Sequence, residues 1–215
     1  MKEIRIDFVS DIACPWCVIG LKSLEQAVDK VADIAAVDLH FHPFELNPQM
    51  APEGEDIVEH LARKYGASEA QGAKTREMIR ARGAELGFTF DMDQRSRIYN
   101  TFDAHRLLHW AELQGRDHDM QMKLFEAYFT KGDNPGSHEV LVRIAGELGL
   151  DAAEADEVLA SGAYAEEVRE REEFFQRQGI SAVPAIIINQ RHLISGGQTP
   201  EVFERALREI ASKME

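Results

Sequence analysis

The two cysteines of this 215-residue chain lie three positions apart, in the segment Cys14-Pro15-Trp16-Cys17. The segment stands where an alternating apolar run over residues 4–9, typical of a strand, gives way to apolar residues at helical spacing. Cys14 therefore falls near the N-cap of the predicted helix. Pro15 falls in its first turn, where a missing N–H group costs nothing. The sequence predicts a pair of thiols at a strand-to-helix junction.

This position suits the two thiols to different tasks. Unpaired N–H groups and the positive end of the helix dipole favour the thiolate of Cys14 over its thiol. Cys17, one turn further along the helix, is placed to attack a mixed disulfide formed at Cys14. We predict that Cys14 is the nucleophile and Cys17 the resolving thiol of a thiol–disulfide exchange.

Two other uses of a Cys-x-x-Cys pair compete with this one. The pair can be half of a zinc site, with His40 and His42 as the other half, although paired histidine ligands are usually about three to five residues apart. The pair can also be a structural disulfide, but a bridge that closes so short a loop restrains the unfolded chain little. Thiol–disulfide exchange is therefore favoured over both, and no metal ligand is predicted.

Charge narrows the function classes further. The chain carries 24 basic and 38 acidic side chains, a formal net charge of −14. This balance repels nucleic acid and anionic membrane surfaces, so neither is an expected partner. Charged residues interleave with the apolar residues at the N-terminus, which argues against a signal peptide or a spanning segment. We expect a cytoplasmic protein, in which an isolated Cys-x-x-Cys is more often catalytic or metal-binding than structural.

The order of predicted elements defines the fold class. A strand, a helix and a second strand are complete by about residue 45, and two strands and a helix follow residue 179. Residues 46–178 between them show apolar residues mainly at helical spacing, with one short extended piece at 88–90. We predict an α/β domain formed by residues 1–45 and 179–215, interrupted by an all-helical insertion of residues 46–178.

Five motifs, in this order, resemble the FrnE-like branch of the DsbA oxidoreductase family. They are Cys-Pro-Trp-Cys at 14–17, Pro-Phe-Glu-Leu-Asn-Pro at 43–48, Asn-Thr-Phe-Asp-Ala-His-Arg-Leu-Leu at 100–108, Gly-Ile-Ser-Ala-Val-Pro at 179–184 and Ile-Ser-Gly-Gly-Gln at 194–198. The resemblance covers the whole chain. It implies a thioredoxin-like fold, β-α-β … β-β-α, split by a helical domain.

The resemblance also implies an activity and a substrate-binding segment. The activity is that of a protein-disulfide oxidoreductase or isomerase that acts on disulfide-containing proteins or small-molecule thiols. It needs no cofactor beyond the redox-active disulfide, with glutathione as a candidate co-substrate. Thioredoxin-like folds place a cis proline beside the dithiol, where the backbone of the preceding residue pairs with an extended substrate. On this pattern, Val183 and Pro184 face Cys14 and the bond between them is cis.

One departure from the family matters. The related periplasmic oxidants usually have a histidine between the cysteines, whereas this chain has the uncharged pair Pro15-Trp16. Two further residues are candidates near the cleft. His105 has either a polar role there or a place in the core, and Asp11 is either a proton acceptor for the dithiol or a turn residue.

Two further functions stay open on the sequence. Sister families, the kappa-class glutathione transferases and hydroxychromene-carboxylate isomerases, suggest glutathione-dependent isomerisation or transfer, although they carry a single catalytic serine at the position of Cys14. A zinc-binding or holdase module without enzymatic activity is the other alternative.

Overall fold

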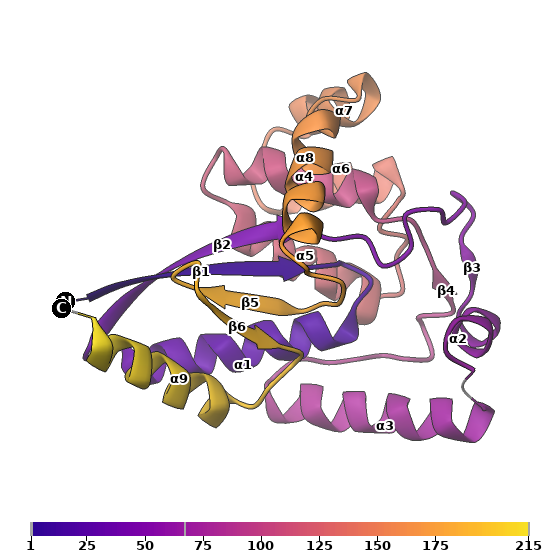
Figure 1. Ribbon diagram of the computed structural model, residues 1–215. Coiled ribbons are helices and arrows are strands. Elements are labelled where there is room, and N and C mark those ends of the chain that lie inside the picture. Colours follow the sequence, from indigo (N-terminus) through magenta and orange to yellow (C-terminus); the bar gives the residue numbers. More distant parts are fainter. Residues whose placement is uncertain (1, 67, 215) are drawn as a thin grey trace.

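The computed structural model describes residues 2–66 and 68–214. A four-stranded sheet in the order β2-β1-β5-β6 lies at its centre (Figure 1). The strands are β1 (Lys2–Ser10), β2 (Ala35–Pro43), β5 (Ala185–Ile188) and β6 (His192–Ser195). β1 pairs parallel with β2 and antiparallel with β5, and β6 is the antiparallel neighbour of β5. Segments from the two ends of the sequence therefore share one sheet, as the predicted order of elements requires.

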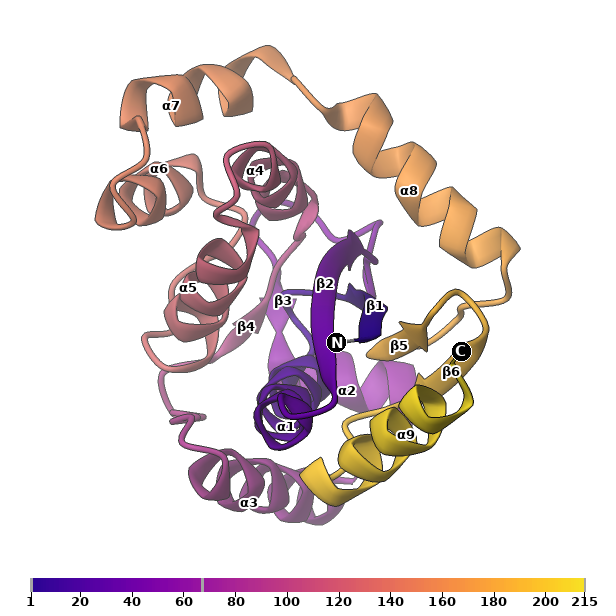
Figure 2. The same cartoon turned by 90° about the vertical axis from the view of Figure 1, so that its left-hand side faces the viewer.

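Alternation along β1 decides which face of the sheet is buried. Ile4, Ile6 and Phe8 are fully buried on one face, because successive side chains of a strand point to opposite sides. Two helices pack against that face, α1 (Pro15–Val31) and α9 (Pro200–Lys213) (Figure 2). Together these elements form the thioredoxin-like α/β fold that the sequence predicts.

Seven helices connect β2 to β5 within the described residues. They are α2 (Ile57–Tyr65), α3 (Glu69–Glu85), α4 (Phe102–Glu112), α5 (Asp117–Phe129), α6 (His138–Glu147), α7 (Ala152–Ser161) and α8 (Ala165–Arg177). Large side chains such as Trp110, Phe125 and Phe129 are almost completely buried between them. None of the helices in the described residues is long and apolar enough to span a membrane.

The helical block differs from the expectation in two details. It contains an antiparallel pair of two-residue strands, β3 (Glu55–Asp56) and β4 (Arg97–Ile98), which the expectation of an all-helical insertion omits. The segment at 88–90 belongs to no strand. Phe90 instead packs edge-on against Phe129, with ring centroids 5.3 Å apart.

The second face of the sheet is only partly covered. α8 lies over this face (Figure 2), and its Phe175 joins an apolar cluster with Val9, Phe44, Ile180 and Ala185. This cluster lies at the end of the sheet where β1 leads into α1. Further along β1, polar side chains occupy the same face.

Candidate active site

The dithiol stands at the start of α1, as predicted. Cys14 is the N-cap residue with an extended backbone (φ −94°, ψ 110°), and Pro15 occupies the first turn. The Cys17 N–H donates to the Cys14 carbonyl over 3.0 Å. Both cysteines are free thiols. Cys14 is 4% exposed and Cys17 is fully buried, so Cys14 is the more accessible of the two.

The segment before β5 meets the dithiol. The Val183–Pro184 peptide bond is cis, as the family resemblance implies, and the Cys14 thiol donates to the Val183 carbonyl at a sulfur–oxygen distance of 3.6 Å. α1 packs closely against this segment and against the turn after β6. A Cβ atom on Gly20 of α1 would lie 3.0 Å from the Pro184 ring, and a Cβ atom on Gly197 would lie 2.9 Å from the Trp16 carbonyl. Cys14, Val183 and Pro184 are thus brought together from opposite ends of the chain.

The environment of Cys17 favours its protonated form. Burial, together with contact with Cys14, raises the pKa of Cys17 well above its usual range, because a buried thiolate loses its hydration. Cys17 therefore holds its proton under conditions in which a more accessible thiol reacts.

Asp11 is buried directly beside the dithiol segment, 1% exposed. Its Oδ1 accepts hydrogen bonds from the Ala13 N–H (3.1 Å) and the Thr101 hydroxyl (2.8 Å), and its Oδ2 accepts from the Leu46 N–H (2.7 Å). Three donors compensate the loss of hydration that burial imposes on a carboxylate. Asp11 thereby fastens the loop before Cys14 both to the segment after β2 and to the start of α4.

His105 lies against the same carboxylate. Its Nε2 is 3.6 Å from Asp11 Oδ1, and the side chain is 1% exposed with neither ring nitrogen in a hydrogen bond. Burial by itself lowers the pKa of His105, but the Asp11 carboxylate and, to a lesser extent, Glu172 and Glu45 raise it overall. The structure thus brings His105 and Asp11 together in the interior.

Two arginines lie near the dithiol at positions that the sequence does not predict. The Arg82 guanidinium stands 5.6 Å from the centre of the Trp16 ring. Arg95 is buried, and its Nη2 donates to the carbonyl of Ala13, the residue before Cys14, over 3.3 Å. Arg95 comes from the irregular segment between α3 and β4, which has no apolar periodicity that would place it.

The histidines considered as zinc ligands have other partners. His40 contacts Asp38 at 2.7 Å, and His42 contacts Asp7 at 2.9 Å. Within residues 2–66 and 68–214, no three His, Cys, Asp or Glu side chains are grouped so as to hold a metal ion.

Comparisons with known proteins agree with this geometry. The model of the DSBA-like thioredoxin domain family matches residues 5–208. The crystal structure of the probable DsbA oxidoreductase SCO1869 from Streptomyces coelicolor superposes with a TM-score of 0.91 at 33% identity, over 99% of this chain and 92% of that one. YwbO of Bacillus subtilis is 28% identical over 211 residues, 98% of either chain.

A more distant structure is similar in fold alone. The cytosolic disulfide reductase DsbM from Pseudomonas aeruginosa, with GSH, gives a TM-score of 0.67 at 18% identity, over 97% of this chain and 99% of that one. The family match spans the dithiol, the helical block and the cis-proline segment together. The chain belongs to the DSBA-like thioredoxin domain family.

Proposed function

We propose that the protein is a thiol–disulfide oxidoreductase or isomerase with Cys14 as nucleophile and Cys17 as resolving thiol. The observation that carries the proposal is the 3.6 Å contact between the Cys14 thiol and the Val183 carbonyl, next to Pro184. An extended substrate chain that pairs with the backbone of Val183 brings its disulfide to this sulfur. The dipeptide Pro15-Trp16 shapes the entrance, with the Trp16 ring half-buried beside Arg82.

In the reducing direction, the exchange has two steps. The Cys14 thiolate attacks one sulfur of the substrate disulfide, forms a mixed disulfide and releases the other sulfur as a thiolate, which takes a proton. Cys17 then gives up its proton and attacks the Cys14 sulfur. The second substrate sulfur leaves, and a Cys14–Cys17 disulfide remains. Two electrons pass to the substrate, and the reverse sequence oxidises a dithiol substrate.

The raised pKa of Cys17 supports this division of labour. A buried, protonated thiol does not compete with Cys14 for the incoming disulfide. It attacks after the mixed disulfide has formed and a base has taken its proton. We propose Asp11, the buried carboxylate that lies 3.6 Å from the His105 ring, as the group that receives that proton.

Single-cysteine variants test the assignment. We expect Cys14→Ser to abolish reduction of insulin or glutathione disulfide, and Cys17→Ser to accumulate a mixed disulfide that mass spectrometry detects. Leu113→Ala, on the exposed end of the helical block, serves as the matched surface control. Full activity in the Cys14→Ser variant would refute the proposal.

The proposal has three finer features, of which the first rests on the sequence motifs and the other two on a relative. Membership of the FrnE-like branch, a cytoplasmic location and glutathione as co-substrate extend it. The similar fold of DsbM, a cytosolic disulfide reductase with GSH in its structure, supports the last two. Equilibration of the dithiol with a glutathione redox buffer measures its potential. A reduction potential well above that of the cytosolic glutathione pool favours a role as oxidant or isomerase, and a potential near that of thioredoxin favours a role as reductase.

The alternatives from the sequence are separable by experiment. Glutathione-dependent isomerisation or transfer does not need Cys17, so retention of activity by Cys17→Ser with an aromatic substrate would favour it. A zinc-binding or holdase module would be revealed by metal in the freshly purified, reduced protein.

A further inference from the structure

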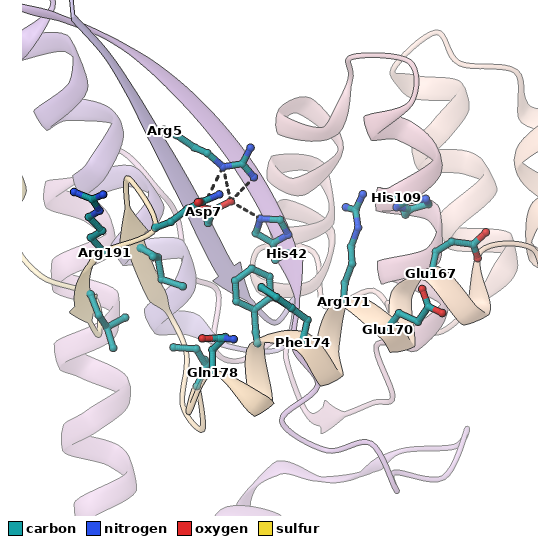
Figure 3. Close-up of a pocket in the computed structure, with 15 residues that line it drawn as sticks. Arg5, Asp7, His42, His109, Glu167, Glu170, Arg171, Phe174, Gln178 and Arg191 are labelled. Carbon is teal, nitrogen blue, oxygen red and sulfur yellow. Dashed lines mark hydrogen bonds and ion pairs between the residues drawn. The ribbon is translucent and has the colours of Figure 1, made fainter.

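A cavity of about 750 Å³ lies between α8 and the partly covered face of the sheet (Figure 3). Its volume is in the range of sites that hold small ligands, roughly 300–1,000 Å³. It is lined by 15 residues, which come from β1, β2, α4, α8, β5, β6 and the loops on either side of β5. Neither cysteine nor Pro184 is among them, so this cavity is separate from the candidate active site.

Part of the cavity lining is apolar. Phe174 is 49% exposed and Leu193 is 53% exposed, and both side chains line this space together with Ile187. The apolar surface of these side chains is in contact with water, and a ligand that covers it gains free energy by removing it from water. This apolar part of the lining therefore suits an apolar or aromatic group.

One end of the cavity carries two arginines, of which Arg5 is paired with Asp7 and Arg191 is not paired with any described residue. The Arg191 side chain has no hydrogen-bond or ion-pair partner among the described residues. Arg5 donates to Asp7 through Nε and Nη2, which leaves its Nη1 group for another acceptor. Arg5 and Arg191 lie toward the same end, on the sheet side of Phe174 (Figure 3). This end suits a carboxylate.

The Asp7 carboxylate next to Arg5 is held in place by hydrogen bonds. Asp7 is 4% exposed and accepts hydrogen bonds from both Arg5 and His42. Burial alone raises the pKa of Asp7, but these bonds with His42 and Arg5 lower it to about 2. The carboxylate is therefore ionised at neutral pH and holds the Arg5 guanidinium in place. The His42 ring in turn packs on Phe175, with centroids 4.5 Å apart.

The opposite end carries negative charge. Glu167 and Glu170 lie there on α8 (Figure 3), and neither has an ion-pair partner within the part of the chain that the structure describes. Arg171 beside them is engaged with Glu112 at 2.5 Å, so it does not neutralise them. This end suits an ammonium group.

We infer that this cavity binds a short peptide, with its C-terminal carboxylate at Arg5 and Arg191, apolar side chains on Phe174 and Leu193, and its amino end at Glu167 and Glu170. The lining stripe of α8 from Glu167 to Gln178 spans about 16 Å, at about 1.5 Å per residue. An extended peptide of about five residues has that length. The order of charges along the cavity sets the direction of the peptide.

Isothermal titration with a synthetic peptide tests the inference. The probe is Lys-Ala-Phe-Leu-Ala with free ends, and the control peptide is the same sequence with a C-terminal amide. We expect saturable binding of the free peptide and about tenfold weaker binding of the amide, because a charge-assisted contact to arginine is lost. Arg191→Gln should weaken the free peptide about tenfold and leave the amide nearly unchanged. Phe174→Ala should weaken both peptides.

Two variants make the result specific. Arg177→Gln removes an exposed arginine of the same helix that is not part of the lining, and it should leave the affinity unchanged. The double variant Cys14→Ser/Cys17→Ser should bind as the unmodified protein does, which separates this site from the dithiol chemistry. The inference is overturned if millimolar peptide gives no saturable binding, if Arg191→Gln and Phe174→Ala have no effect, or if binding is lost with the two thiols.

Discussion

Arg95 places a buried positive charge one residue from the nucleophile. Its guanidinium lies 4.7 Å from the ring centre of Tyr128 and 4.8 Å from that of Phe129. No carboxylate pairs with it among residues 2–66 and 68–214. The two aromatic faces offset part of the cost of burying a cation. Arg95 therefore brings a cation without a carboxylate partner among the described residues to the loop directly before Cys14.

Replacing this cation should move the redox equilibrium of the dithiol. A nearby positive charge favours the thiolate and so stabilises the reduced form. We expect Arg95→Met to shift the Cys14–Cys17 equilibrium in a glutathione redox buffer about threefold to tenfold toward the disulfide. Arg95→Lys, which keeps the charge, should shift it less. Equal equilibrium constants for the three proteins would contradict an electrostatic role.

Residues of the candidate site differ in how far the sequence could place them. Cys14 and Pro15 follow from local rules, because N-caps and first-turn prolines mark helix starts. Val183 and Pro184 came only from the family resemblance, since no local rule brings a segment 169 positions away to Cys14. Arg95 lies in an irregular segment whose position depends on tertiary packing alone.

At the scale of elements, α1 is wedged between the cis-proline segment and the turn after β6. The two glycines at these contacts, Gly20 and Gly197, leave no room for a side chain. The backbone of α1 can therefore approach both segments, and this approach sets the position of the dithiol relative to Val183.

A side chain at Gly197 should destabilise the fold. A Cβ atom at Gly197 would stand 2.9 Å from the Trp16 carbonyl, a backbone atom that cannot turn aside. We expect Gly197→Ala to destabilise the protein by about 1–3 kcal/mol in urea denaturation and to slow insulin reduction.

A second glycine supplies the control. Gly72 lies within α3, where the nearest atom to an added Cβ is a mobile Arg76 nitrogen at 3.4 Å. Gly72→Ala should raise stability by up to about 1 kcal/mol, since alanine favours helix. A Gly197→Ala protein as stable and active as the unmodified one would show that the contact is not required.

Elements with strong periodicity were predictable, and those without it were not. β1 and β2 have alternating patterns, β5 is a continuous apolar run, and α1 and α9 have apolar residues at helical spacing. β3 and β4 are two residues each, too short for any period to register. Val58 and Tyr65 of α2 follow the helical spacing of apolar residues, yet they are 48% and 61% exposed. Apolar spacing along a helix does not show which other element, if any, packs against that face.

At the scale of the whole molecule, acid should weaken the fold through Asp7. Its pKa is about 2 in the structure, against an ordinary value of 3.8. A lowered pKa stabilises the fold above the ordinary value, and this contribution is lost as the pH falls from about 4 toward 2. The difference corresponds to about 2 kcal/mol.

Urea denaturation at a series of pH values measures this contribution. The unmodified protein should lose more stability between pH 5 and pH 2 than Asp7→Asn, by about that amount. Identical pH dependences of the two proteins would show that Asp7 does not carry the effect.

The two ends of the described chain lie beside each other. The Lys2 ammonium donates to the Ala211 carbonyl over 2.8 Å and also to that of Met214. A short linker between them, with a new opening after Gln178, would give a circular permutant in which β5, β6, α9, β1, α1 and β2 run without interruption. If the proposed division at residues 45 and 179 is correct, the permuted protein should fold and retain disulfide exchange. The helical block would then be an appendage at one end of the chain, removable by a single cut.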